Sequence, residues 1–582
     1  MTLTAARPRR RLVRALPGLG HLHPYPRTWL RYDVVAGVVL ATLLVPQGMA
    51  YAELAGLPPI TGLYTTAVAL LAYALIGPSR VLVLGPDSSL GPVIAATIAP
   101  LAVAGSPEQA VVYASVLALM VGALTMAAGL LRLGFVADLL SRPTQLGYMN
   151  GLALTILVSQ LPKLCGFSVD ADGLIPEASA FVRGVADGDV VGVAAVVGVA
   201  GLALILLCQR YVRSVPGVLM AVVLSILAVQ VFDLTSHGVS VVGAMPQGFP
   251  PLTVPTISAH DLSLLIAGAV GIAVVSLTDT ISTASVFAAR AGEEVDGNRE
   301  MIGVGAASFA AGLFQGFPVS TSGSRTAVAV QNGARSPLAS LVGVAGVVAM
   351  LLWVPGLLRN LPQPALAAVV IAASLSLADL PGLARLRRMR TSEFVLAIAA
   401  FLAVAVLGVL PGIGVAVALS ILNVFRRAWW PHQAVLGRAE GLYGFHDVAF
   451  HEEKEHLAGL ALYRFDAPLL FVNARSFREE VRRLVAVSPP PRWLVLAAEP
   501  ITDVDTTAGD MLAELDRELA DAGTRLMFAE LKDAVRQKIE RYELANTLDP
   551  GRYHATVRAA VEAYQAETGE RWTPGPSPYR LD

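Results

Sequence analysis

The chain has 582 residues, of which 55% are hydrophobic and only 15% are charged. Soluble domains carry about 25% charged residues, so this composition excludes an entirely soluble protein. The formal net charge of -1 conceals an asymmetry, because charged residues are sparse before about residue 425 and dense after it. The sequence therefore predicts a membrane domain over residues 31–428, followed by a soluble domain.

The N-terminal region, residues 1–30, is basic and precedes the first long apolar run. That run is followed by many more, which argues against a cleaved signal peptide and favours a cytosolic segment. An amphipathic segment lying on the inner membrane surface fits the same arginines equally well.

Fourteen apolar segments have the length or the pattern of membrane spans. Their predicted ranges are 33–54, 60–78, 85–103, 111–131, 144–161, 190–210, 216–234, 262–289, 301–315, 324–335, 337–359, 364–379, 392–410 and 412–427. Lys and Arg gather in the loops that follow the even-numbered segments. This bias predicts an α-helical multi-pass protein of the cell inner (plasma) membrane, with both termini in the cytoplasm.

The third and the tenth segments are interrupted. Residues 316–325 combine a proline, two glycines and several hydroxyl side chains, and Gly85 and Pro86 interrupt the third segment. Irregular backbone at membrane depth survives only inside protein or beside a water-filled cavity. Interruptions at the same place in two halves of seven are typical of transporters built from inverted repeats. Two facing helix N-termini, together with Arg325, predict a site for a small anion.

The soluble part, predicted over 440–566, alternates β-rich and helical patterns. The predicted strands are 458–463, 469–473, 493–498 and 525–529, and the predicted helices are 475–486, 506–522 and 531–545. This alternation predicts a small α/β domain with a mixed sheet. The polar segment 567–582, rich in Pro and Gly, is predicted to be a disordered tail.

Several motifs occur in a characteristic order along the chain. They are VPQGMAYA at 45–52, LGP at 84–86, DGNRE at 296–300 and PVSTSGSR at 318–325. Together they resemble the sulfate permease (SulP) family of anion transporters, and the soluble domain resembles the STAS domain that follows the membrane domain in that family. The resemblance implies a 7+7 inverted repeat with a core domain (segments 1–4 and 8–11) and a gate domain (5–7 and 12–14). It also implies an elevator-like motion and a homodimer.

By the same resemblance, the substrate binds between the third and the tenth segments. The implied substrate-binding residues are Gln47, Tyr51, Pro86, Ser322, Gly323, Ser324 and Arg325. Hydroxyls and backbone N–H groups can replace the hydration shell of an anion, and Arg325 supplies fixed charge. Two structural alternatives stay open: Gln47 caps the broken backbone of a neighbouring segment, or Arg325 pairs with an acid or with helix carbonyls.

Asp279 lies within the eighth segment, four residues before Thr283 and therefore on the same helix face. An acid inside a span is by default a functional hypothesis. Asp279 could bind a coupling proton, ligate Na⁺ together with Thr283 as in the sodium-coupled bicarbonate carriers of the family, or pair constantly with Arg325. Asp87, at the start of the third segment, is expected to cap that helix; the alternative is a cation site shared with Asp279.

In the soluble domain, the turn DVDTTA at 503–508 matches the one that carries a phosphorylated hydroxyl in bacterial regulators. That hydroxyl would fall on Thr507. A helix N-cap made by Asp and Thr residues is the favoured interpretation. The two cysteines, Cys165 and Cys208, form no disulfide framework or zinc pattern.

These patterns predict a secondary active transporter of a small anion, most simply sulfate with H⁺ coupling, and with bicarbonate or a dicarboxylate as alternatives. No Walker motif or catalytic constellation is seen, so we expect no enzyme activity, no cofactor, no nucleic-acid partner and no metal other than Na⁺. A Na⁺-coupled bicarbonate symporter stays open. So does a channel-like or non-transporting membrane scaffold acting through the STAS domain. A nucleobase carrier would place an acid on the tenth segment, where this chain has Arg325.

Overall fold

A computed structural model describes residues 16–23, 25–102, 106–134, 140–169, 171, 173–211, 216–353, 355–439, 441–451, 454–542, 549–575 and 578–579. The chain divides into two compact units, Met1–Ile421 and Leu422–Asp582. Half of the predicted N-terminal region, residues 1–15, lies outside the described residues.

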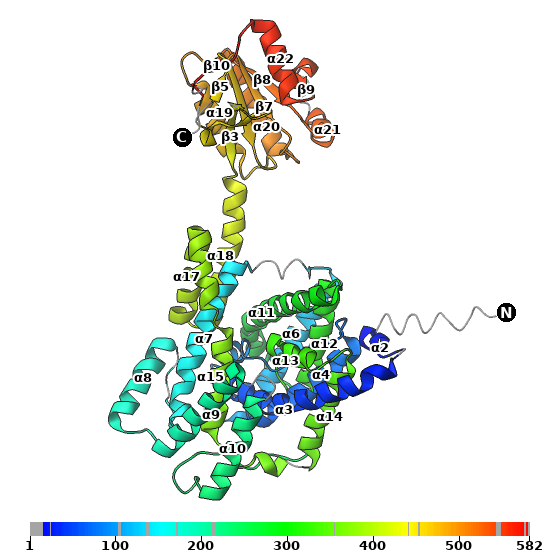
Figure 1. The fold of residues 1–582 in the computed structure, drawn as a ribbon, viewed down its shortest axis with the longest axis vertical. Helices are drawn as coiled ribbons and strands as arrows, with labels where there is room; N and C mark the ends of the chain where they lie inside the picture. Colours follow the sequence, from blue (N-terminus) through cyan, green and yellow to red (C-terminus); the bar gives the residue numbers. More distant parts are fainter. Residues whose placement is uncertain are drawn as a thin grey trace, which may run out of the picture. The chain divides into compact units, whose positions relative to one another are not determined.

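The first unit is helical, and each of the fourteen predicted membrane segments contains a helix (Figure 1). These helices are α3 (Leu30–Leu54), α4 (Pro59–Ile76), α5 (Gly91–Ile98), α6 (Pro107–Leu130), α7 (Arg142–Leu164), α9 (Gly192–Tyr211), α10 (Gly217–Phe232), α11 (Ala259–Ala291), α12 (Gly297–Leu313), α13 (Gly323–Gln331), α14 (Leu338–Trp353), α15 (Gln363–Leu377), α17 (Thr391–Leu407) and α18 (Val409–Trp429). By length and composition, seven helical stretches of the described chain can cross a membrane.

Short helices also occur in the N-terminal region, in connections between predicted segments, and at the end of the predicted segment 337–359. They are α2 (Pro17–His21), η1 (Arg27–Trp29), α8 (Leu174–Asp187), η3 (Pro355–Leu358) and α16 (Leu380–Met389). At 14 and 10 residues, α8 and α16 are too short to span a bilayer.

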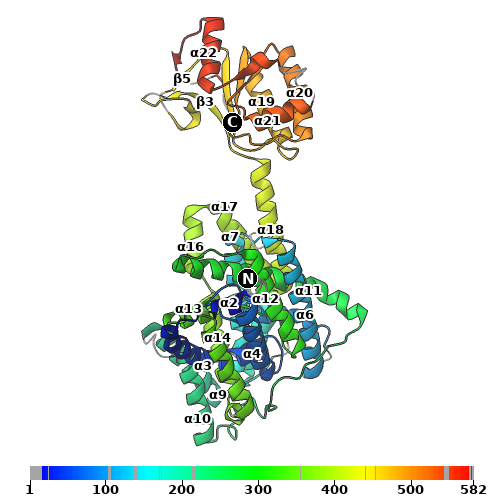
Figure 2. The ribbon, with the colours of Figure 1, turned by 90° about the vertical axis from the view of Figure 1, so that its right-hand side faces the viewer.

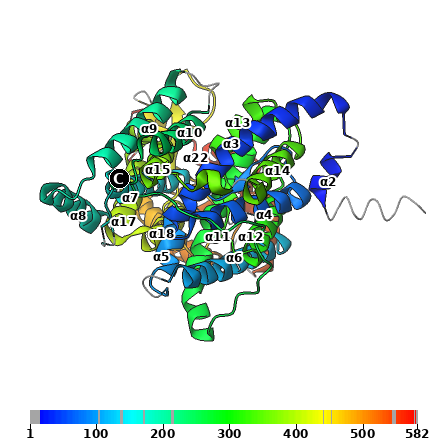
Figure 3. The ribbon, with the colours of Figure 1, turned by 90° about the horizontal axis from the view of Figure 1, so that it is seen from below.

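The helices of the first unit form two groups. In one group α12 packs along α6 and α4, while α14 packs against α3 and α4. In the other group α7 packs against α17 and α15, and α15 packs against α9 and α10. Figure 3 shows the two groups side by side. Since α3 also contacts α15 and α10, it lies at the border between them.

Helices α3 and α4 approach closely where two glycines meet. A Cβ atom built on Gly62 would lie 1.9 Å from the carbonyl oxygen of Gly48. Small residues let the backbones of membrane helices pack in direct contact. This contact fixes the part of α3 that carries Gln47 and Tyr51.

Gly62→Ala is expected to destabilise the membrane unit, because its methyl group forces α3 and α4 apart. Overpacking of this kind costs about 1–3 kcal/mol, measured as a fall in the melting temperature of the purified full chain. The matched control is Gly414→Ala in α18, whose added Cβ would meet nothing within 4 Å. Equal melting temperatures for the two variants would contradict the expectation.

The second unit is an α/β domain built on a mixed sheet, as predicted. Its strands are β3 (Gln433–Ala439), β4 (His446–Asp447), β5 (Lys454–His456), β6 (Leu460–Phe465), β7 (Trp493–Ala497), β8 (Arg525–Ala529), β9 (Tyr553–His554) and β10 (Thr573–Pro574). The order is β10-β5-β3-β6-β7-β8-β9, with β4 paired to β3. Strands β6 to β9 run parallel, and β3 is antiparallel to β6.

Helices cover both faces of this sheet because its central strands are apolar on both sides. Along β6, Tyr463 and Phe465 join the cluster that includes α19 (Ala474–Val485), α20 (Thr506–Asp521) and α21 (Asp533–Arg541). The alternate residues Leu460 and Leu462 face α22 (Val557–Thr568). Figure 2 shows α22 on one side of the strands and the other three helices opposite.

Two predictions for the soluble part are wrong. Residues 469–473 form no regular strand; Leu469 makes a lone bridge to Val504, and the side chain of Asn473 accepts a hydrogen bond from Leu470 N at 2.9 Å. This side-chain contact turns the chain into α19. The predicted disordered tail contains β10, which pairs with β5, and a Tyr579 that is 1% exposed. Residues 576–577 and 580–582 lie outside the described residues.

Candidate functional site

The third and tenth segments meet as two short extended stretches. β1 (Leu84–Gly85) pairs antiparallel with β2 (Ser320–Thr321), with Leu84 opposite Thr321. Beyond the pair, Ser322 N donates to Val83 O at 3.0 Å, and Val83 N donates to Thr326 Oγ1 at 3.1 Å. The irregular backbone is therefore hydrogen-bonded inside the protein, as membrane depth requires.

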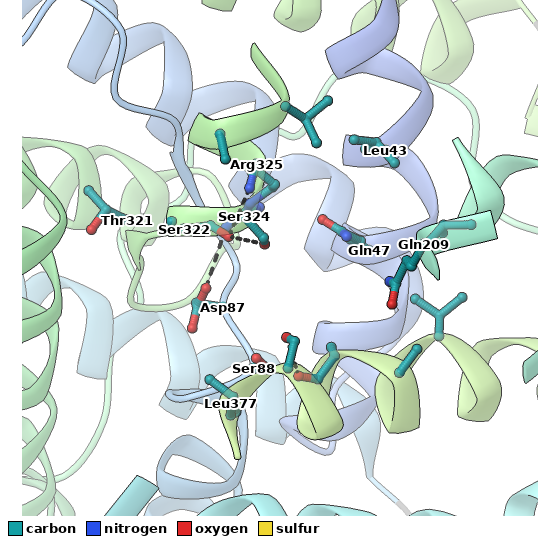
Figure 4. Close-up of a pocket in the computed structure, with 18 of the residues that line it drawn as sticks. Leu43, Gln47, Asp87, Ser88, Gln209, Thr321, Ser322, Ser324, Arg325 and Leu377 are labelled. Atoms are coloured by element: carbon teal, nitrogen blue, oxygen red, sulfur yellow. Dashed lines mark hydrogen bonds and ion pairs between the residues drawn. The ribbon is translucent and has the colours of Figure 1, made fainter. Parts of the chain in front are cut away.

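A cavity of about 610 Å³ lies beside this crossing (Figure 4). It is bounded by α3, α11 and α13 on one side and by parts of α7, α9, α10 and α15 on the other. The predicted site residues that line it are Gln47, Tyr51, Asp279, Thr283, Ser322, Gly323, Ser324 and Arg325. The turn before α5 contributes Asp87 and Ser88, so eight segments of the chain line one cavity.

The start of α13 opens into the cavity. Ser322 is the N-cap residue, its Oγ lies 3.1 Å from Ser324 Oγ, and Gly323 and Ser324 are exposed. The first backbone–backbone hydrogen bond of this helix runs from Thr326 N to Ser322 O, at 3.0 Å. The N–H groups of Gly323 and Ser324 precede that bond and are left for other acceptors. Hydroxyls and N–H groups therefore converge at one helix end.

Arg325 is buried behind this helix start. Its Nη2 donates to Pro86 O at 2.6 Å and lies 3.8 Å from Asp87 Oδ2. Nε and Nη1 have no hydrogen-bond partner among the described residues. Arg325 is among the residues that line the cavity, and its side chain is 0% exposed. Of the structural alternatives foreseen for Arg325, the pair with an acid is present, and the acid is Asp87.

Pro86 is the one predicted substrate-binding residue outside the cavity lining. Its carbonyl oxygen holds the Arg325 guanidinium instead. Because Gly85 has a φ of 151° and no side chain, its backbone approaches Arg325, and a Cβ there would lie 3.1 Å from Nη1. The Gly85-Pro86 interruption therefore serves to seat the arginine.

Asp87 caps the turn that leads into α5. Its Oδ1 accepts hydrogen bonds from Ser89 N at 3.0 Å and from Ser89 Oγ at 2.8 Å, and its backbone carbonyl accepts from Leu90 N and Gly91 N. The predicted cap of the helix itself is not formed, because the N-cap of α5 is Leu90, which makes no side-chain hydrogen bond; Asp87 caps the preceding turn instead. Asp87 also lines the cavity, which the sequence analysis had not assigned to it.

Asp279 reaches across to the third segment rather than to Arg325. Its Oδ2 accepts from Ser89 Oγ at 3.0 Å, and its Oδ1 accepts from Gln145 Nε2 of α7 at 3.5 Å. The constant Asp279–Arg325 pair is therefore wrong for this structure, because Asp87 takes that place. Thr283 faces the start of α13, where a Cβ on Gly323 would lie 3.9 Å from its Oγ1.

Gln47 projects from α3 toward the cavity (Figure 4), and its Oε1 is buried with no hydrogen-bond partner in the described chain. This does not support the structural alternative in which it caps a neighbouring backbone. Further polar residues that the sequence analysis missed line the same space: Ser88, Gln145, Gln209, Ser282, Gln331, Asn332 and Ser376. Gln145 was detectable as an amide in an apolar segment. Gln209, Gln331 and Asn332 lie at helix ends, where polar residues give no such signal.

In the STAS-like unit, Asp505 is the N-cap of α20, and its side chain accepts from Ala508 N at 2.8 Å. The cap interpretation of this turn is therefore confirmed for Asp505. Thr507 is the second residue of the helix and is exposed. Its hydroxyl is accessible but takes no part in the cap.

Residues 30–400 match the sequence family described as the sulfate permease family, and residues 452–560 match the STAS domain. "Probable sulfate transporter MT1781" of Mycobacterium tuberculosis is 42% identical over 550 residues, which cover 94% of this chain and 98% of that protein. "Sulfate transporter 4.1, chloroplastic" of Arabidopsis thaliana is 29% identical over 584 residues, covering 96% and 84% of the two chains.

Two solved structures share the fold. The murine anion transporter Slc26a9 in its inward-facing state superposes with a TM-score of 0.87 over 97% of this chain and 96% of its own, at 22% identity. The transmembrane domain of the cyanobacterial bicarbonate transporter BicA gives a TM-score of 0.59 over 66% of this chain and 97% of its own, at 24% identity. With its broken third and tenth segments and its C-terminal α/β unit, this chain is a multi-pass membrane protein that belongs to the sulfate permease family.

Proposed function

We propose that this protein is a secondary active transporter of a small oxyanion, with sulfate as the first candidate. The observation that carries the proposal is the start of α13, where hydroxyls and N–H groups open into the cavity with the Arg325 guanidinium behind them. A helix N-terminus carries about half a positive charge. That field, added to the charge of arginine, favours an anion over a cation or a neutral solute.

Sulfate comes first because relatives matching more than nine-tenths of this chain are named sulfate transporters. Bicarbonate follows because the fold neighbour BicA is a bicarbonate transporter. Dicarboxylates present similar oxygens. A cavity of about 610 Å³ is large enough for all three, so its volume does not rank them.

The transport cycle proposed is an elevator-type motion of a core domain against a gate domain. We assign α3–α6 and α11–α14 to the core and α7, α9, α10, α15, α17 and α18 to the gate, as two halves of a 7+7 inverted repeat. The two packing groups, and the cavity between them, support this division. Asp87, Asp279 and Arg325 all belong to the core, so the binding and coupling groups would travel together. The loop charges support cytoplasmic termini in the inner membrane, and the family resemblance supports a homodimer.

Coupling is assigned to H⁺ bound at Asp279, a carboxylate in the cavity wall that is hydrogen-bonded to the third segment. Na⁺ is the second candidate, because the Thr283 hydroxyl lines the same wall one helical turn away and Na⁺ takes oxygen ligands.

The experiment is uptake by proteoliposomes that contain the full chain, with labelled sulfate, bicarbonate or fumarate under imposed proton or sodium gradients. Saturable sulfate uptake driven by an inward proton gradient is expected. Uptake driven only by sodium would reassign the coupling ion, and currents far above carrier rates would favour a channel. Failure to take up any of the three anions would contradict the proposed function.

A further inference from the structure

Two carboxylates share one hydroxyl at the edge of the cavity. Ser89 Oγ lies 2.8 Å from Asp87 Oδ1 and 3.0 Å from Asp279 Oδ2. A serine hydroxyl has one proton, so it can donate to only one of the two at a time. Both contacts become hydrogen bonds when one extra proton is present: the Asp279 carboxyl donates to Ser89, and Ser89 donates to Asp87. The two distances therefore fit a pair of carboxylates, Asp87 and Asp279, that shares one proton through Ser89.

The protonation state of Asp87 also sets the net charge of the Asp87–Arg325 pair. The two side chains are 3.8 Å apart and are 11% and 0% exposed, so solvent screens the pair weakly. An ionised Asp87 cancels the positive charge behind the start of α13. A protonated Asp87 leaves that charge available to an anion in the cavity.

The surroundings contain no competing charge among the described residues that line the cavity, which add only neutral polar and apolar groups to Asp87, Asp279 and Arg325. From α3, Tyr51 faces Asp87 and Arg325. From α7, Tyr148 faces both carboxylates, and Gln145 hydrogen-bonds Asp279. With both carboxylates ionised, this cluster is net negative and repels an anion; one proton makes it neutral.

We propose that Asp87 is a removable counter-ion of Arg325, and that Asp87, Ser89 and Asp279 form one proton-sharing unit that links protonation to anion binding. The proton on Asp279 Oδ2 passes to Ser89 Oγ as the Ser89 proton passes to Asp87 Oδ1. One O–H bond breaks and one forms at each step, and the transfer ends with Asp279 ionised and Asp87 neutral. The proposal rests on the proposed function and places coupling in three residues rather than in Asp279 alone.

The test is sulfate binding to the purified full chain by calorimetry, from about pH 5 to about pH 8. If binding requires one proton on the unit, the affinity falls about tenfold per pH unit once the empty unit is deprotonated. In Asp87→Asn this slope is expected to vanish, with sulfate at about pH 8 bound at least about tenfold more tightly than by the wild type. Asparagine still accepts the hydrogen bond from Ser89 N, so the cap is kept while the charge is removed.

The matched control is Asp261→Asn, on the first turn of α11, where the carboxylate is half-buried, lies outside the cavity lining and accepts a hydrogen bond from Tyr113. It should keep the wild-type slope. A wild-type slope in Asp87→Asn overturns the proposal and leaves Asp87 as a cap. Wild-type binding that ignores pH overturns the proposal but not the proposed function. If neither sulfate, bicarbonate nor fumarate binds at any pH, both fall.

Should Asp87→Asn fail to fold, the wild-type protein still tests whether sulfate binding takes up a proton. Binding heats measured in buffers of different ionisation enthalpy count the protons taken up with each sulfate. Uptake that approaches one proton at the upper end of the pH range supports the unit. Zero uptake across the whole range overturns it.

Discussion

Arg325→Gln is expected to lower the initial rate of sulfate uptake by at least about 100-fold, equivalent to about 3 kcal/mol of lost stabilisation. The substitution removes the fixed charge behind the start of α13. It also leaves the Asp87 carboxylate, 3.8 Å away in this structure, without its cation. Breaking a buried pair on one side costs about 3–5 kcal/mol of stability. The melting temperature of the full chain should therefore fall together with transport.

A second substitution separates these two effects. Adding Asp87→Asn to Arg325→Gln removes the unpaired carboxylate, so the melting temperature should recover while uptake stays low. Arg335→Gln is the matched control, because Arg335 is exposed and stacks on the Tyr32 ring outside the cavity. Normal uptake by Arg325→Gln would show that the helix start alone binds the anion.

Asp279→Asn is expected to abolish the accumulation of sulfate that a proton gradient drives at neutral pH, while downhill sulfate exchange continues. Asparagine can keep the contact with Ser89 but cannot carry a proton between the two sides of the membrane. Asp87, paired with Arg325, then remains as the one carboxylate of the unit. Accumulation and exchange are measured in the same proteoliposomes, with and without a pH gradient.

Asp261→Asn again provides the control, since it changes a carboxylate of the same helix outside the cavity lining. It should accumulate sulfate as the wild type does. Accumulation by Asp279→Asn at the wild-type level would remove Asp279 as the coupling residue and move attention to Asp87.

The helices and the break points could be predicted from the sequence because lipid constrains composition strongly. A run such as 316–325 has no place in an ordinary span, and Gly85-Pro86 marks its counterpart. The pairing of Asp87 with Arg325 could not be predicted, because the two residues are far apart in the chain. Composition does not say which residues of two distant segments lie opposite each other. The role of Ser89 could not be predicted either, because serine is common in polar turns. Its contact with Asp279, 190 residues away, is visible only in the structure.

In the soluble domain, too, composition predicts some strands and misses others. Its central strands β6, β7 and β8 are apolar on both faces and were found from that pattern. The edge strand β10 was missed because Pro and Gly dominate the composition of its segment. Two aromatic residues outweigh that composition: Trp572 lies 6.0 Å from the Phe445 ring, and Tyr579 is buried in the helix-covered core.

The β1–β2 crossing joins the third and the tenth segments through main-chain hydrogen bonds that do not depend on side-chain identity. Ser88 and Ser324 line the cavity beside this crossing, but their side chains are not part of the β1–β2 pairing. Replacing them changes the chemistry offered to a solute. We therefore expect a few point substitutions at these positions to change which anion the cavity accepts, while the β1–β2 crossing keeps its shape.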